Sequence, residues 1–151
     1  MIAMERHFSS EFFASNRKKL LTLFAGTAPI VVTANGLLQS TSDSTFPLRQ
    51  DRDFWYLTGV DEPDTLLIID KSKEYLILSE EHDRRVRFDG ATTADDIRKI
   101  SGVNEILDHK AGWQRLNSRL KRVKHVATLP APSPYVPFYG FYSNPARASL
   151  I

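Results

Sequence analysis

Apolar side chains change their spacing along the chain, and these changes predict helices and strands in turn. Residues 9–25 carry apolar positions at helical spacing after a capping serine, and Gly26 follows where the helix should end. The buried stripe of this helix is expected to consist of Phe13, Leu20, Leu21 and Phe24. Residues 28–34 form a continuous β-branched run instead, which predicts a central strand covered on both faces.

The middle of the chain carries a second pair of apolar runs. Residues 65–70 and 74–79 stand on either side of a short Lys71-Ser72-Lys73 turn, which predicts an antiparallel hairpin. Residues 80–87 are so rich in charge that we expect a loop or a single helical turn. The remaining elements are expected to be a helix over 94–100, an edge strand over 103–107, an amphipathic helix around 113–123 and a strand over 125–129.

Alternation of helices with strands favours an α/β fold built on one mixed sheet of about five to six strands. The last segment, residues 130–151, differs from the rest because prolines recur among aromatic side chains, a composition typical of extended chain. A length of 151 residues with 42% hydrophobic and 25% charged side chains suits a single globular domain with one core.

Composition excludes several classes of function. The absence of cysteine removes disulfides, zinc-thiolate sites and cysteine nucleophiles, and it favours a reducing, cytoplasmic compartment. A formal charge of +2 is too small to indicate a nucleic-acid partner. The N-terminus lacks the pattern of a signal peptide, and no apolar run approaches the length of a membrane span, so we expect no membrane partner.

Side chains of catalytic type are present, but none of them forms a complete site. The turn carboxylates Asp61, Glu62 and Asp64 flank Pro63 and are more simply explained as turn residues than as an acid-base pair. The histidines lack the spacing of metal ligands, and the glycines and serines match no phosphate-binding loop or nucleophile elbow. We therefore predict no catalytic and no metal-binding residue in this chain.

The tract from Asp43 to Asp64 is the most distinctive part of the sequence. Its aromatic block, residues 54–57, is expected to lie in the core. Asp43 and Arg49 are the exceptions, because Asp43 lies among small polar residues in a predicted loop and Arg49 heads the dense part of the tract. Loops carry function more often than cores do, so these two residues are candidates for contact with a ligand or another domain.

The same tract carries a family resemblance. Asp43-Ser44, Phe46-Pro47, Arg49-Gln50, the run from Asp53 to Gly59 and Glu62-Pro63 follow one another before an apolar strand. This order resembles the N-terminal domain of the aminopeptidase P, prolidase and creatinase family, and most closely its Xaa-Pro aminopeptidase branch. The resemblance implies a mixed sheet flanked by helices on both faces, with residues 1–151 as one non-catalytic domain.

What the resemblance implies for function is a supporting role. In this family two divalent metal ions, usually manganese, and their ligands belong to a separate C-terminal catalytic domain, toward which residues 130–151 would lead. The N-terminal domain packs against that domain, builds a dimer or tetramer and helps to wall the pocket for a peptide with proline in second position. Asp43 matches a pocket-facing acidic position, and Arg87 stands where relatives carry Trp before Phe-Gly. That departure puts direct substrate contact through the loop of Arg87 in doubt.

The aromatic end of the chain has two interpretations. On the family interpretation Tyr135, Phe138 and Tyr139 are surface at an interface with another domain. The alternative is a stand-alone protein-binding module, in which the same aromatic and proline-rich end recognises a partner and no hydrolase exists. The two interpretations differ in whether the gene continues into a segment with five metal ligands.

Overall fold

The computed structural model describes residues 8–130 and residue 150. In chain order the elements are α1 (Ser10–Leu23), β1 (Ile30–Thr33), α2 (Arg52–Thr58), β2 (Leu66–Asp70), β3 (Lys73–Ile77), α3 (His82–Phe88), α4 (Ala94–Ser101), β4 (Glu105–Leu107) and α5 (His109–Val123). No helix among these residues has the length and apolar character needed to cross a membrane.

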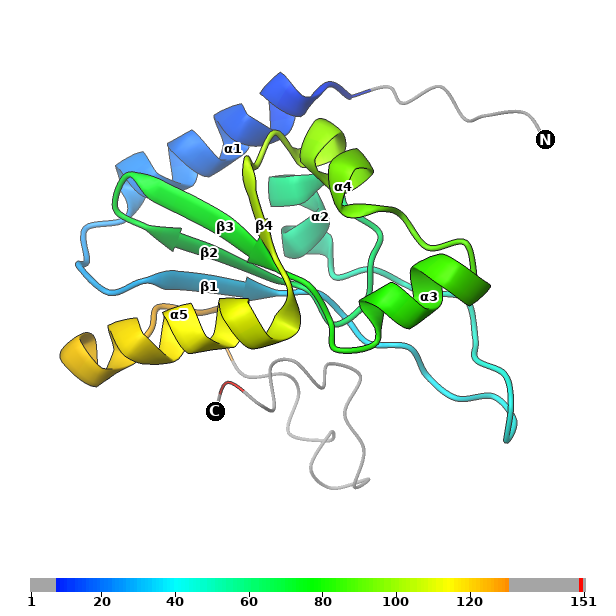
Figure 1. Cartoon of the computed structure of the whole chain (residues 1–151). Helices are drawn as coiled ribbons and strands as arrows, with labels where there is room; N and C mark the ends of the chain where they lie inside the picture. Colours follow the sequence, from blue (N-terminus) through cyan, green and yellow to red (C-terminus); the bar gives the residue numbers. More distant parts are fainter. Residues whose placement is uncertain (1–7, 131–149, 151) are drawn as a thin grey trace.

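The described strands form one mixed sheet in the order β1-β2-β3-β4 (Figure 1). β1 and β2 pair antiparallel with Val31 opposite Ile68, β2 and β3 form the expected hairpin with Ile68 opposite Tyr75, and β4 joins β3 in parallel. The expected α/β class, with both pairing directions in one sheet, is confirmed.

The expected count of five to six strands is wrong, because the sheet of the described residues has four. Residues 125–129 contribute a single parallel bridge, in which Val31 N donates to Ala127 O (2.8 Å) and Ala127 N donates to Pro29 O (2.9 Å). A longer ladder is prevented because Lys124 takes a left-handed conformation just before this segment, and Pro130 has no N–H to donate just after it. β1 is accordingly the first strand of the sheet rather than a central one, although all its residues are buried.

Helices cover both faces of the sheet. On one face lie α1, α2 and α4 (Figure 1). They pack over alternate strand residues such as Val32, Leu67 and Leu76, and Phe54 and Ile97 belong to the same buried cluster. On the other face α5 packs through Leu116 against the intervening strand residues. These residues are Val31, Leu66, Ile68, Tyr75 and Ile77. The two-residue alternation of each strand therefore divides one sheet between two cores.

Two of the helices differ from expectation. The aromatic block of the tract forms α2, which begins where Asp51 Oδ1 accepts a hydrogen bond from Phe54 N (2.9 Å) and ends at the left-handed Gly59. Phe54 and Leu57 are buried as predicted, but Tyr56 is 46% exposed because it points from the solvent side of this helix. Most of the charged segment 80–87 belongs to the seven-residue helix α3, which ends at Phe88, rather than to a loop or one turn.

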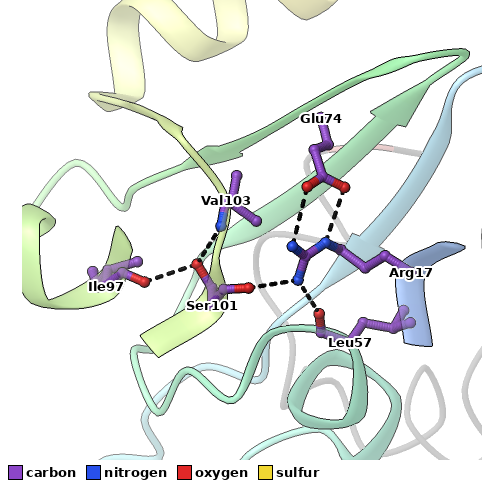
Figure 2. Close-up of polar contacts among 6 residues, drawn as sticks. All are labelled: Arg17, Leu57, Glu74, Ile97, Ser101 and Val103. Atoms are coloured by element: carbon purple, nitrogen blue, oxygen red, sulfur yellow. Dashed lines mark hydrogen bonds and ion pairs between the residues drawn. The ribbon is translucent and has the colours of Figure 1, made fainter. Parts of the chain in front are cut away.

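A buried arginine joins the helical layer to the sheet (Figure 2). The guanidinium of Arg17, on α1, donates two hydrogen bonds to the carboxylate of Glu74 on β3, at 2.9 and 3.0 Å. Its Nη1 also donates to the carbonyl oxygens of Leu57 and Ser101, both at 2.8 Å, near the C-terminal ends of α2 and α4. Because helix ends leave carbonyls without intrahelical partners, one cation satisfies two of them and ties four elements together.

Candidate functional site

Three candidate residues lie at the same end of the sheet. β1 and β3 end there, and β2, α3 and α5 begin there, so this end carries the connections made by residues 34–51, 60–65 and 78–92 (Figure 1). We call it the loop end; the β2–β3 turn lies at the opposite end. Asp43 and Arg49 lie on its longest connection and Arg87 on α3.

Asp43 occupies the tip of a small hairpin-like loop. Gln39 and Thr45 form an antiparallel bridge, and Phe46 N donates to Leu38 O at 2.8 Å. Asp43 itself is exposed, and its Oδ1 accepts a hydrogen bond from Thr41 Oγ1 at 2.9 Å. The loop therefore presents a carboxylate to solvent, where it is available to a ligand.

The base of this loop is held by Gln50. Its Oε1 accepts hydrogen bonds from Asn35 N (3.0 Å) and Asp51 N (2.9 Å), and its Nε2 donates to Val60 O and Glu62 O at 3.1 and 3.0 Å. From the sequence we selected Arg49 as a candidate and did not predict that the neighbouring Gln50 holds the base of the loop. The sequence did contain a signal for this role, because Gln50 stands directly before the helix-capping Asp51. A glutamine side chain can donate and accept hydrogen bonds, so it can satisfy backbone groups on two other segments at once.

Arg49 has an exposed side chain beside an apolar cleft. The cleft has a volume of about 360 Å³ and is lined by Arg49 together with Asn35, Gly36, Leu38, Phe46 and Pro47. The backbone of Arg49 is fixed because its carbonyl accepts from Asn35 Nδ2 at 2.9 Å. A fixed backbone with an exposed cationic side chain is suited to contact with another surface.

Arg87 is exposed on α3, a short helix held by the buried carboxylate of Glu62. Glu62 Oε2 accepts from Arg85 Nη1 and Glu62 Oε1 accepts from Thr92 N, both at 2.8 Å. These bonds join the middle of α3 and the segment that follows it to the turn before β2. The carboxylate of Glu62 is thus engaged in structure rather than offered to a substrate.

Asp64 stands apart from the other turn carboxylates. It has a left-handed backbone with φ of 54°, and its N–H donates to Asn35 O at 3.1 Å. Burial raises the pKa of its carboxyl group, and the nearby Arg85 guanidinium opposes that rise in pKa. A half-buried carboxyl of this kind stays protonated to a higher pH than an exposed aspartate does.

The loop end gathers charged groups without assembling a catalytic centre. No hydrogen bond or ion pair among the described residues joins Asp43, Arg49 and Arg87 to one another. Within the same part of the chain, no three His, Cys, Asp or Glu side chains come together as a metal site. The interface candidates Tyr135, Phe138 and Tyr139 lie outside the described residues.

Comparison with known proteins identifies the domain. The family model described as "Aminopeptidase P, N-terminal domain" matches residues 13–127. The chain belongs to this family. The resemblance seen in the sequence is therefore confirmed, and it extends from α1, through the tract and the sheet, to the bridge at Ala127.

Curated relatives of the domain are Xaa-Pro aminopeptidases. That of Escherichia coli strain K12 is 36% identical over 67 residues, which cover 44% of this chain and 15% of the relative. Xaa-Pro aminopeptidase 3 of Dictyostelium discoideum is 28% identical over 98 residues, which cover 61% of this chain and 19% of the relative. The chain thus spans less than a fifth of the length of these relatives.

Solved structures agree on the fold. A Bacillus anthracis protein assigned to aminopeptidase P superposes with a TM-score of 0.76 at 20% identity, covering 95% of this chain and 35% of that chain. E. coli aminopeptidase P with the inhibitor Pro-Leu gives a TM-score of 0.69 at 23% identity, and the superposition covers 87% of this chain and 31% of that chain. The zinc-substituted E. coli enzyme in complex with product gives a TM-score of 0.62 at 25% identity, and the superposition covers 75% of this chain and 27% of that chain.

Proposed function

We propose that this chain is the non-catalytic N-terminal domain of a metal-dependent Xaa-Pro aminopeptidase. One observation carries the proposal: the family match covers residues 13–127, whereas the chain covers only 15% of its 36% identical relative. Most of such an enzyme is therefore not represented in these 151 residues. The activity belongs to the longer protein, and this domain supports it.

The metal chemistry is assigned to a C-terminal catalytic domain. One solved relative is zinc-substituted, but the described residues of this chain offer no group of three metal ligands. The described residues do not fit a metal centre, so we assign no metal-dependent step to them. Two divalent ions, manganese in the interpretation drawn from the sequence, would be held by the catalytic domain.

The loop end is proposed as part of the wall of the substrate pocket. Asp43 presents an exposed carboxylate at a loop tip, which can attract the positively charged amino terminus of a peptide. Arg49 and Arg87 present exposed guanidinium groups from two neighbouring connections, suited to carboxylates of the substrate or of the catalytic domain. The shape of this wall depends on Gln50 and Glu62, which hold the connections in place.

The partners follow from the same proposal. The first is the catalytic domain of the same protein, with Tyr135, Phe138 and Tyr139 in the contact region. The second is a further copy of the protein in a dimer or tetramer. The substrate is a peptide with proline in second position, and the compartment is the cytoplasm.

The experiment compares this chain with the product of its complete reading frame. Both are assayed with an Xaa-Pro peptide in the presence of manganese. We expect cleavage by the full-length product and none above a blank by residues 1–151 alone. Metal-dependent cleavage by the chain alone would refute the proposal. A complete reading frame without five metal ligands would favour the stand-alone binding module.

A further inference from the structure

A cleft of about 310 Å³ opens beside the loop end, on the face of the sheet that α5 covers. Asp64 lines it from the turn before β2 and Leu66 from the first residue of β2, His109 and Trp113 from the first turns of α5, Leu37 from the connection after β1, and Arg84 from α3. Asp43, Arg49 and Arg87 do not line it. The cleft is close to the smallest size, about 300 Å³, at which pockets hold small molecules.

Two buried polar atoms of opposite type belong to residues of this cleft. Asp64 Oδ1, an acceptor when ionised, and Trp113 Nε1, a donor, are both buried without a hydrogen-bond partner among the described residues. Buried polar groups in native proteins nearly always have hydrogen-bond partners, because burial of a polar group without one destabilises the fold. Two such atoms at one cleft point to a missing ligand that both donates and accepts.

Charge rules out an anion as that ligand. Asp64, Glu80 and Glu81 all line the cleft, and the two arginines beside them are already engaged. Arg85 pairs with Glu62 at 2.8 Å and Arg84 pairs with Glu81 at 2.6 Å. A cation held by metal-type ligands fits no better, because the indole of Trp113 offers only a donor.

We propose that this cleft binds a peptide bond of an extended polypeptide, whose N–H donates to Asp64 and whose C=O accepts from Trp113. A peptide unit carries one donor and one acceptor and no charge, which matches the two unpartnered atoms. Leu37, Pro63 and Leu66 supply apolar surface for a neighbouring side chain. The site needs no metal and no catalytic domain, so binding at this cleft can be tested separately from the proposed aminopeptidase function.

The test uses the two tryptophans of the chain, Trp55 and Trp113, whose indole N–H groups give separate signals in a nitrogen-15 NMR spectrum. The labelled 151-residue chain is titrated with 4-methylpentanoic acid N-methylamide, which carries a single peptide-type amide beside a leucine-like chain. We expect a saturable shift of the Trp113 indole signal while that of Trp55, in the aromatic cluster with Phe13, stays in place. Absence of a saturable shift of the Trp113 indole signal would overturn the proposal. Asp64 Oδ1 and Trp113 Nε1 would then be assigned hydrogen bonds with water.

Two variants and one altered probe establish the hydrogen bonds. Trp113→Phe keeps an aromatic ring but lacks the N–H, and Asp64→Gly keeps the left-handed backbone but lacks the carboxylate; each should weaken binding about five- to tenfold. Binding to the variants is followed by the backbone amide signals of Leu37 and Leu66 in the cleft, because Trp113→Phe has no indole signal at this position. Methyl 4-methylpentanoate keeps the carbonyl and the leucine-like chain but has no N–H, so it should bind the unaltered chain about five- to tenfold more weakly than the amide does. It should match the amide on Asp64→Gly.

Equal affinity of ester and amide for the unaltered chain would contradict the proposal, and this comparison holds even when a variant fails to fold. Equal binding by folded Trp113→Phe would contradict it as well. Failure of the aminopeptidase assay leaves these binding results unchanged, because they are measured on residues 1–151 alone.

Discussion

At the residue scale, Arg17 shows how one side chain can organise several elements. Its side chain is 2% exposed, yet its charge is paired with the carboxylate of Glu74. Its Nη1 donates hydrogen bonds to two carbonyl oxygens at helix ends. Burial of an unpaired guanidinium would be prohibitive, so the cation and its partners must come together as a unit. Ser101 completes the cluster, because its Oγ donates to Ile97 O and accepts from Val103 N (Figure 2).

We predict that Arg17→Leu lowers the free energy of unfolding by about 3 kcal/mol, because it leaves a carboxylate and two buried carbonyls without their donor. The value is at the lower end for buried pairs because Glu74 is 34% exposed and can regain water. Urea denaturation measures the change. Arg84→Ala is the control, since Arg84 forms an exposed pair with Glu81 and its loss should change stability by less than about 1 kcal/mol. Equal effects of the two substitutions would show that the Arg17 cluster has no special weight.

At the element scale, α2 illustrates a helix that is determined by its ends. Asp51 caps its first turn, and Gly59 ends it with φ of 67°, in direct contact with the Phe13 ring of α1. α4 uses the same arrangement, with Thr93 as the N-terminal cap and Gly102 as the C-terminal one. Short helices are marginal by themselves, so these caps and the packing against α1 and the sheet sustain them.

Gly59→Ala should destabilise the protein more than Gly90→Ala does. Both glycines have φ of 67°, so the backbone strain of an added Cβ is matched at about 1 kcal/mol. At Gly59 that Cβ would lie 2.3 Å from the buried Phe13 ring, whereas at Gly90 nothing lies within 4 Å. We expect an additional loss of about 1–3 kcal/mol at Gly59 from overpacking. Thermal unfolding of both variants gives the difference, and equal melting temperatures would mean that the ring moves aside freely.

At the scale of the whole molecule, the residues that stabilise the fold lie apart from the exposed residues that we propose for ligand contact. Its two cores and the Arg17 cluster lie along the strands, while the exposed groups of Asp43, Arg49 and Arg87 lie on connections at the loop end. A change in a connection can therefore alter binding and leave the core untouched.

We predict that Asp43→Ala in the full-length protein lowers kcat/KM for an Xaa-Pro peptide by about tenfold or more, from the loss of one charge-assisted hydrogen bond. The melting temperature should change little, since Asp43 is exposed and, among the described residues, its side chain hydrogen-bonds only with Thr41 of its own loop. Asp53→Ala, at an exposed position in the first turn of α2, is the matched control and should keep full activity. An unchanged kcat/KM with a lowered melting temperature would assign Asp43 to structure instead.

The elements best predicted from the sequence are those in which one local period extends over many residues. The spacing around Leu20 in α1 and Leu116 in α5 and the apolar runs of β1, β2 and β3 were sufficient for this. α2 escaped prediction because Phe54 to Leu57 are all apolar, so the buried and exposed sides of the helix carry the same kind of residue. The tract nevertheless identified the family through the order of its residues.

By itself, the sequence determined the α/β class, the hairpin, the main helices and the membership of the aminopeptidase P N-terminal domain family. Only the tertiary structure decided that Ala127 forms a bridge rather than a strand, that Arg17 meets Glu74 across 57 positions, and that Asp64 and Trp113 line one cleft. The physical reason is the separation along the chain over which each kind of interaction acts. Periodicity, caps and turns act between near neighbours, whereas ion pairs and unpartnered atoms depend on segments that meet only when the chain has folded.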